Sequence, residues 1–293
     1  MAKYYQGQIE IKKFKNFKWN DKIISLEEFP YIKEAYRAQW HYEQGEKSWY
    51  FLKSFDDMQR LIAELIGSEL ALFLNIPTVT YQVIPDPIIP KKRLVLASKN
   101  KMKPRERYYT LEDLNIIRMD YFHAIKKFSC YEDFIAAIAP MFHSKEAMIK
   151  FQKQIAAMIA IDIFTVQLDH DFDGNSYYEK QNDLTLSFLL DYELSLGGLE
   201  RFDATQNYIH QTPFFNQQFL DSELPVFEES FPYLKESLDQ LMKIPFDTFL
   251  EHIERKYNIQ FANPIKNYTL KILNKRQNSL ANFRQISEKQ NNI

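Results

Sequence analysis

The stretch DIFTVQLDHDFDGN, residues 162–175, joins the end of an apolar helix to an acidic loop. The residues around its start, Ser144–Leu168, predict a long helix, because apolar side chains recur there at helical spacing. The residues after it predict a short hairpin, with strands at Ser176–Tyr178 and Leu184–Leu190 and with Asp191 at its end. The polar side chains of the loop are therefore expected between a long helix and a strand pair.

Strand patterns dominate the first hundred residues, around a single helix. This helix is expected from about Asp56 to Leu74, where apolar residues share one face, and Asn75-Ile76-Pro77 ends it. Strands are expected on either side of the helix, at Gln8–Phe14, Ala38–Glu43, Ser48–Lys53, Thr78–Ile84 and Arg93–Ser98. This part of the chain therefore predicts a small sheet accompanied by one helix.

Helical patterns predominate after Lys99. Ahead of the long helix, further helices are expected at residues 112–119, 120–128 and 131–142. The last hundred residues predict more helices between proline-containing loops, and a frayed polar tail at Ser287–Ile293. We therefore expect an α+β fold in two lobes, in which residues 1–98 form a small β-rich N-lobe and residues 99–293 form a larger helical C-lobe.

Composition and charge narrow the range of functions. The 293 residues carry a formal net charge of −2, so no strong overall field attracts the chain to nucleic acid, and direct nucleic-acid binding is not expected. Cys130 is the only cysteine, which excludes an internal disulfide framework and a cysteine-rich zinc site. No apolar run reaches the ~18 residues of a membrane span, and the first residues lack the apolar core of a signal peptide. We therefore expect a cytoplasmic protein that does not associate with membranes.

Five side chains supply what phosphoryl transfer requires. The reaction needs a cation on the phosphates, a carboxylate that orients the attacking hydroxyl, and oxygen ligands for Mg²⁺. Lys53 ends a strand, and Glu64 lies on the following helix, where it can face back and hold Lys53 as an ion pair. Asp169 begins the acidic loop, Asn175 ends it, and Asp191 terminates the later strand. The sequence therefore supplies, in plausible places, each kind of residue that phosphoryl transfer needs.

Three groups of residues in this arrangement resemble HipA-like kinases. The first group is WYFLK (49–53), followed by AELIGSELA (63–71) and NIPTVTY (75–81). The second is DIFTVQLDH (162–170), and the third is FLLDYELSL (188–196). They are similar to the family's strand ending in lysine, to its helix that enters the catalytic loop, and to its metal-binding segment. The resemblance covers roughly residues 45–200, and phosphoinositide kinases share a similar loop at a greater distance.

The resemblance implies a protein-kinase-like fold and a serine/threonine protein kinase that uses ATP and Mg²⁺. It implies that Lys53, together with Ala97 and Ser98, binds the cofactor. The expected partners are a protein substrate and, because family members often act as toxins, a cognate antitoxin or regulator. Phosphorylation of the enzyme's own phosphate-covering loop is a further expectation.

The resemblance also assigns roles to the remaining site residues. It implies that Glu64 positions Lys53, that Asp169 is the catalytic base, and that Asn175 and Asp191 hold Mg²⁺. The loop is one residue longer than the family pattern, His170 stands where an arginine is usual, and residues 31–40 contain no glycine. These departures leave two alternatives open: a different base, Asp171, and a pseudokinase that binds partners without turnover.

Two further alternatives come from the residues themselves. Glu69 lies on the same predicted helix as Glu64 and competes with it for Lys53. The loop Asp169–Gly174 matches the first half of an EF-hand calcium loop, in which alternate carboxylates converge on one ion. That motif requires a glutamate at its twelfth position, where this chain has Lys180, and a helix after the loop. A calcium-binding interaction protein is therefore the second alternative function.

Overall fold

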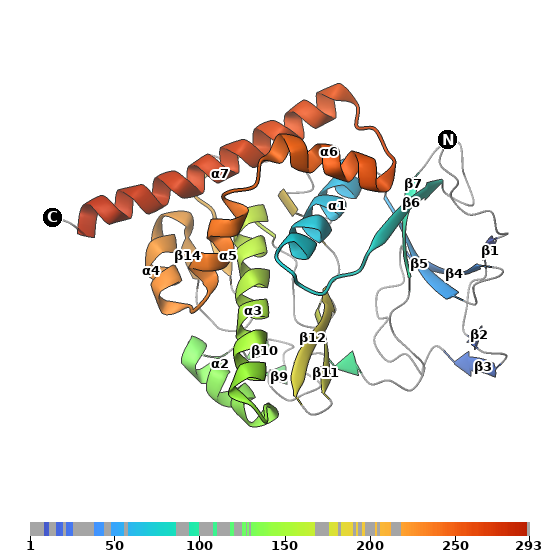
Figure 1. Ribbon diagram of the computed structural model, residues 1–293, viewed down its shortest axis with the longest axis horizontal. Helices are drawn as coiled ribbons and strands as arrows, with labels where there is room; N and C mark the ends of the chain where they lie inside the picture. Colours follow the sequence, from blue (N-terminus) through green and yellow to red (C-terminus); the bar gives the residue numbers. More distant parts are fainter. Residues whose placement is uncertain are drawn as a thin grey trace.

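The fold is described from a computed structural model (Figure 1). The described residues are 9–11, 16–19, 22–25, 38–43, 48–55, 58–85, 94–99, 108–109, 118–119, 125–126, 128, 130–167, 176–180, 183–189, 192, 195–196, 203, 206–211 and 218–291. Within this part of the chain helix and strand are mixed, helices predominate, and the sheets are small. The predicted α+β class is confirmed at that level.

One antiparallel sheet of five strands gathers most of the N-terminal strands. Its order is β1-β4-β5-β7-β6, so that β5 lies at the centre between β4 and β7. The predicted strands at 38–43, 48–53 and 93–98 are confirmed, and the strand predicted at 78–84 begins three residues later. The bounds are β1 Ile9–Ile11, β4 Ala38–Glu43, β5 Ser48–Ser54, β6 Tyr81–Pro85 and β7 Leu94–Lys99.

Helix α1, Met58–Phe73, connects the sheet to the rest of the molecule. All side chains from Leu61 to Ala71 are buried, including the polar ones of Glu64, Ser68 and Glu69. A helix buried on all sides needs hydrogen-bond partners for such groups. The helix ends at Phe73, and Asn75, two residues later, has a φ of 58° in the left-handed region. The predicted helix at 56–74 is confirmed.

Helix α3, Lys145–Thr165, is the long helix that the apolar stripe predicts. It starts at Ser144, whose hydroxyl accepts a hydrogen bond from the backbone N–H of Ala147 at 3.1 Å. It ends at Val166, which adopts a left-handed conformation with a φ of 50°. From Ile155 onward every residue of the helix is buried, and the helix contacts α1, α5, α7 and β12.

The predicted hairpin after the acidic loop is confirmed. Strands β11, Ser176–Lys180, and β12, Leu184–Leu189, pair antiparallel, and β8, Tyr108–Tyr109, adds a third strand on β11. The backbone N–H of Leu189 donates to the carbonyl of Pro77 at 3.0 Å, which joins the hairpin to the segment after α1.

The helices predicted at 112–119 and 120–128 are wrong over the described residues. There β9, Arg118–Met119, pairs antiparallel with β10, Ile125–Lys126. Short apolar runs fit either element, and pairing between segments decides between them. Two further strand pairs were not predicted: β2 with β3, and β13 with β14. Their bounds are Asn16–Trp19, Lys22–Ser25, Ile209–Gln211 and Gln218–Leu220.

Helices form the remaining C-terminal part, as predicted. The longest is α7, which crosses the molecule beside α6 and α4 (Figure 1). It continues to Asn291, so the tail expected to fray is helical up to that residue. The bounds are α2 Tyr131–Ile138, η2 Ala139–Met141, η4 Asp221–Glu223, α4 Leu224–Ser230, α5 Leu234–Leu241, α6 Phe246–Tyr257 and α7 Asn263–Asn291.

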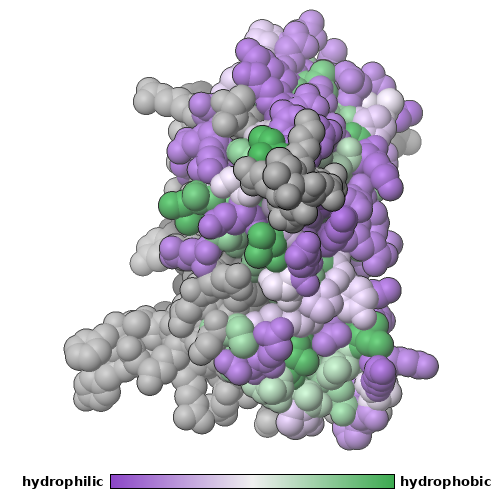
Figure 2. All heavy atoms as spheres, turned by 90° about the vertical axis from the view of Figure 1, so that its left-hand side faces the viewer, coloured by the Kyte–Doolittle hydropathy of each residue, from purple (hydrophilic) through white to green (hydrophobic). Residues whose placement is uncertain are grey.

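Figure 2 shows one face of the molecule, on which hydrophilic side chains predominate in the upper part and hydrophobic ones lie among them and lower down. Among the described helices, none is both long and apolar enough to cross a bilayer. The large apolar side chains that are exposed come from four different elements: Met58, Phe73, Ile209, Val226 and Ile286. They therefore do not form a stripe along any single helix.

Candidate active site

A buried ion pair joins the central strand of the sheet to α1. Lys53 Nζ of β5 lies 2.8 Å from Glu64 Oε2 of α1, and the side chain of Glu64 is 0% exposed. The second carboxylate oxygen, Oε1, accepts a hydrogen bond from the hydroxyl of Tyr81 at 2.6 Å. The ion pair predicted from the spacing of Lys53 and Glu64 is confirmed.

The two partners of this pair differ in their access to solvent. Lys53 keeps 12% of its side chain exposed, and its ammonium lies 5.4 Å from the centre of the Phe55 ring. Removing a carboxylate from water is costly unless charge and hydrogen bonds compensate, and Lys53 and Tyr81 supply both to Glu64. Glu64 therefore holds a cation at the edge of the buried region, which is the arrangement that a lysine needs to meet a phosphate group.

Glu69, the alternative partner of Lys53, faces another part of the molecule. Its Oε1 accepts hydrogen bonds from Lys256 Nζ at 2.6 Å and from the hydroxyl of Tyr257 at 2.5 Å, both on α6. The alternative in which Glu69 pairs with Lys53 is therefore wrong.

Ala97 and Ser98 lie on β7, directly beside the strand that carries Lys53. Ala97 is opposite Leu52, and Ser98 is opposite Phe51. Both residues are buried. The structure thus brings Lys53, Glu64, Ala97 and Ser98 into one region, and a role for Ala97 and Ser98 in nucleotide binding stays a prediction.

The acidic residues of the candidate site lie outside the described residues. This applies to Asp169, Asp171, Asn175 and Asp191. Among the described residues, no group of three or more His, Cys, Asp or Glu side chains could hold a metal ion. The expected Mg²⁺ ligands are therefore still those predicted from the sequence.

The residues on either side of Asp191 are placed close to α1. Leu189 bonds to the Pro77 backbone, and Tyr192 is completely buried against Gly67 of α1. A Cβ atom added at Gly67 would come within 2.4 Å of the Tyr192 ring, so only glycine allows this approach. Burial, with the carboxylates of Asp162 and Glu64 nearby, raises the pKa of Tyr192 well above its usual value. Leu189 and Tyr192 are therefore both held near the helix of Glu64.

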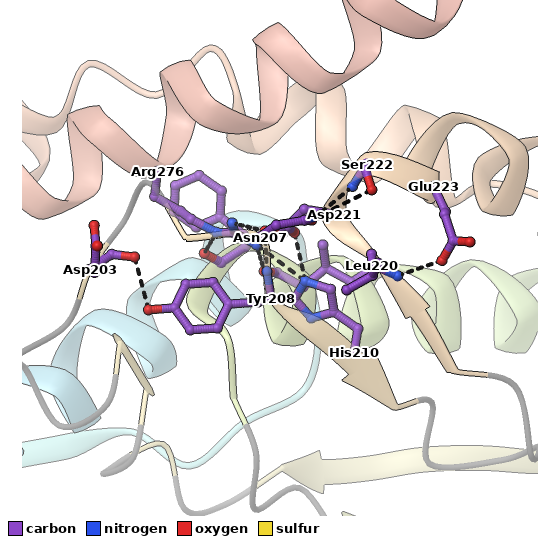
Figure 3. A network of polar contacts seen from close by, with 11 residues as sticks. Asp203, Asn207, Tyr208, His210, Leu220, Asp221, Ser222, Glu223 and Arg276 are labelled. Atoms are coloured by element: carbon purple, nitrogen blue, oxygen red, sulfur yellow. Dashed lines mark hydrogen bonds and ion pairs between the residues drawn. The ribbon is translucent and has the colours of Figure 1, made fainter.

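A second buried charge cluster lies at the end of α3, and the sequence patterns did not predict it (Figure 3). Arg276 of α7 is completely buried and binds Asp221 with two hydrogen bonds, of 2.5 and 2.7 Å. The same guanidinium donates to the carbonyls of Ile163 and Phe164, at 2.8 and 3.2 Å. These carbonyls belong to the last turn of α3, where backbone acceptors lack helical partners and cations are favourable.

His210 completes this cluster. Its Nε2 lies 2.7 Å from Asp221 Oδ1 and 3.3 Å from Arg276 Nη2. Burial lowers the pKa of His210, although Asp221 opposes the shift. Burial alone would raise the pKa of Asp221, but hydrogen bonds from His210 and Arg276 hold it at about 2. An ionised Asp221 and a neutral His210 therefore fix Arg276 against the helix that leads to the acidic loop.

The strand after the acidic loop argues against an EF-hand. That motif needs a second helix, whereas the chain continues directly into β11, which includes Lys180. The EF-hand interpretation of the loop Asp169–Gly174 therefore lacks its second half.

The fold is that of HipA-like kinases. No family model matches this chain, and no curated protein matches it. Among solved structures, it is similar to the Helicobacter pylori proinflammatory kinase CtkA, with a TM-score of 0.58 and 14% identity over 85% of this chain and 95% of that one. It is also similar to HipA from a toxin–antitoxin complex of Shewanella oneidensis MR-1, with a TM-score of 0.51 and 9% identity over 79% of this chain and 57% of HipA. Both neighbours are HipA-like kinases, as the sequence resemblance predicted.

Proposed function

We propose that this protein is an ATP-dependent kinase that phosphorylates serine or threonine hydroxyls of a protein. The observation that carries the proposal is the Lys53–Glu64 ion pair, formed between a central strand and a buried helix in a fold shared with two kinases. Protein kinases depend on a lysine–glutamate pair of this kind to hold the ATP phosphates. In this proposal residues 1–98 and 99–293 form the two lobes on either side of the nucleotide.

The reaction transfers the γ-phosphoryl group of ATP to a substrate oxygen. The bond between the γ-phosphorus and the bridging oxygen breaks, ADP leaves, and a bond forms from the γ-phosphorus to the hydroxyl oxygen. Asp169 orients the hydroxyl and accepts its proton, and Lys53 balances negative charge on the phosphates. Mg²⁺, for which Asn175 and Asp191 would supply oxygen ligands, neutralises further charge when bound. Glu64 keeps the lysine ammonium in place throughout.

A regulatory protein partner in the cytoplasm is part of this proposal. The HipA neighbour was solved with HipB in a toxin–antitoxin system, which supports an antitoxin-like partner for this chain. The present chain spans 57% of HipA, so the surfaces used there need not all exist here.

A pseudokinase is the second candidate. Its support is the acidic loop, which is one residue longer than the HipA-like pattern, and the absence of glycine from residues 31–40. Such a protein would bind ATP through Lys53 without transferring phosphate.

The test is phosphate transfer from labelled ATP in the presence of Mg²⁺, with and without a generic protein acceptor. We expect label in the wild-type protein or the acceptor, and none with Asp169→Ala or Asp191→Ala. Glu254→Gln serves as a matched control, because it removes a carboxylate of α6 that pairs with Lys266 and not with Lys53. If no label transfers but ATP·Mg²⁺ raises the melting temperature, the pseudokinase is supported. If ATP·Mg²⁺ also leaves the melting temperature unchanged, the kinase proposal fails.

A further inference from the structure

Helix α1 is held from a second side by α6. Glu69 of α1 is 5% exposed, and its Oε1 accepts hydrogen bonds from Lys256 at 2.6 Å and Tyr257 at 2.5 Å. Its Oε2 lies 3.5 Å from His252 Nε2. Burial and the neighbouring Glu69 raise the pKa of Tyr257, so its hydroxyl keeps the proton that it donates. One buried carboxylate thus receives all its polar partners in the described structure from a helix 187 residues further along the chain.

Glu64 and Glu69 point to different sides of the same helix. Five residues at 3.6 residues per turn separate their directions by about 140° around the helix axis. Lys53 therefore holds α1 from the sheet, and Lys256 and Tyr257 hold it from α6. Figure 1 shows α6 lying alongside α1 and close to β6, and these elements are in contact. A rotation or shift of α1 that keeps the Lys53–Glu64 contact would therefore break the contacts of Glu69 with α6, and the reverse also holds.

We propose that Glu69 is a positioning residue, and that its grip by Lys256 and Tyr257 keeps α1 in the orientation in which Glu64 pairs with Lys53. The inference rests on the proposed kinase function for its consequence on activity. Protein kinases are controlled through the position of the helix that carries this glutamate. In this protein the control passes through α6, so that a partner or modification that releases Lys256 or Tyr257 would disassemble the lysine–glutamate pair.

A purely structural role for these contacts makes a different prediction. In that case the loss of any comparable ion pair of α6 would change the reactivity of Lys53 equally. The chain contains a matched pair for this comparison: Lys266 Nζ lies 2.6 Å from Glu254 Oε2, the same distance as Lys256 from Glu69. Lys266 and Lys256 are also similarly exposed, at 27% and 36%. The Lys266–Glu254 pair joins α6 to α7 and does not involve α1.

The experiment measures how fast the Lys53 amine reacts with an acetylating reagent, which does not require catalysis. The full chain is treated with an acetylating reagent, and acetylation of Lys53 is followed by mass spectrometry in wild type, Lys256→Met, Tyr257→Phe, their double variant and Lys266→Met. We expect the rate at Lys53 to rise about fivefold or more in the double variant and less in each single one, since couplings between sites are commonly of this size. Lys266→Met should match wild type. Lys256→Arg, which keeps a cation, should restore the wild-type rate.

Melting temperatures are measured on the same samples. If the double variant melts as Lys266→Met does while its Lys53 rate rises, positioning is supported, and loss of stability does not explain the result. If the double variant fails to fold, the two single variants decide by the same comparison. A Lys53 rate that is equal in wild type, Lys266→Met and the Lys256 and Tyr257 variants would overturn the proposal.

Phosphate transfer then separates this inference from the proposed function. With an active wild type, we expect kcat/KM for ATP to fall about fivefold or more in the double variant and to stay unchanged in Lys266→Met. If wild type transfers no phosphate but the Lys53 rate responds as expected, the positioning role stands and the kinase proposal fails. If activity falls without any change at Lys53, the positioning role is overturned.

Discussion

Two carboxylates of this protein are completely buried beside a cation, yet their surroundings differ. Lys53, which keeps 12% of its side chain exposed, lies with its Nζ 2.8 Å from Oε2 of Glu64. Asp221 meets Arg276, which is fully enclosed, through two hydrogen bonds. The first pair joins a strand to a helix near the candidate nucleotide region, whereas the second lies among α3, α7 and the β13–β14 strands.

The difference follows from the chemistry of the two cations. A lysine ammonium is a compact charge on a flexible stem, so it can add a phosphate oxygen to its contacts while it stays near a carboxylate. The planar guanidinium of Arg276 has its donors directed at Asp221 and at the last carbonyls of α3. The Glu64 pair is therefore suited to meet a ligand, and the Asp221 pair is suited to fix the architecture. The predictions below test this division.

The largest effect is expected at Arg276. Replacing it by methionine in Arg276→Met leaves Asp221 buried without its main counter-charge, and we expect the free energy of unfolding to fall by about 3–5 kcal/mol. Urea unfolding at pH 7 measures the loss. Adding Asp221→Asn should recover part of it, because the unpaired charge is then removed. A loss below about 1 kcal/mol in Arg276→Met would show that the cluster does not support the fold.

The next effect is on activity and concerns Lys53. In Lys53→Met, phosphate transfer should fall about 10²-fold, a size typical of losing a group that stabilises developing charge. Stability should fall less than in Arg276→Met, since Glu64 keeps the hydrogen bond from Tyr81 and can take up a proton. The two variants are compared by urea unfolding and by transfer from labelled ATP. Stability losses of equal size, with activity retained, would remove the distinction between the two pairs.

The sequence predicted one of these two regions and missed the other. Lys53 and Glu64 are eleven residues apart, on a strand and a helix that local patterns identify, so their meeting could be inferred. Arg276 and Asp221 are 55 residues apart, and Arg276 lies 113 residues from Ile163. No local periodicity relates these positions, and a buried arginine resembles a solvent-exposed one in the sequence.

The secondary structure follows the same rule: elements set by local periodicity were predicted, and elements that depend on a distant partner were not. The long, strongly periodic helices α1 and α3 were predicted to within a few residues. The sequence pattern predicts helices where the short strands β9 and β10 lie, because two-residue strands depend on a partner rather than on their own pattern. The acidic residues Asp169, Asn175 and Asp191 stay predictions, since they lie outside the described residues.

A smaller effect is expected at Gly67, which bears on the helix of the Glu64 pair. Replacing a helical glycine by alanine usually stabilises a protein by up to about 1 kcal/mol. Here the new Cβ would overlap the Tyr192 ring at 2.4 Å, so Gly67→Ala should instead cost about 1–3 kcal/mol. The Tyr192 Cβ also lies 2.4 Å from the added atom, so only glycine at position 192 removes the overlap, and in a Tyr192→Gly background the same substitution should become neutral or stabilising. Thermal unfolding of the four proteins measures the coupling, and simple additivity would show that Gly67 and Tyr192 do not interact.

The smallest effect concerns pH and separates His210 from the carboxylates. The pKa of His210 is lowered in the folded protein, so the unfolded chain binds more protons as the pH falls through 6.5. His210 therefore contributes stability above this pH that is lost below it. Asp221 has a folded pKa of about 2 against 3.8, so its contribution is complete above pH 3.8 and is lost only as the pH falls from there toward 2. Between pH 7 and 5 the cluster thus loses stability through His210 alone.

The measurement is the free energy of unfolding from pH 7 to pH 5 in wild type, His210→Gln and His143→Gln. Glutamine keeps a polar group near Asp221 and does not titrate, so the decrease toward pH 5 should be shallower in His210→Gln. His143 is 78% exposed and lies outside the cluster, so His143→Gln is the control for replacing a histidine elsewhere. Because Arg276 lies 3.3 Å from His210 Nε2, a protonated imidazole would meet a second positive charge there, which opposes protonation in the folded state. Equal slopes in all three proteins would mean that His210 is protonated as easily in the folded as in the unfolded chain. The cluster of Arg276, Asp221 and His210 would then not oppose protonation of the imidazole, contrary to its geometry.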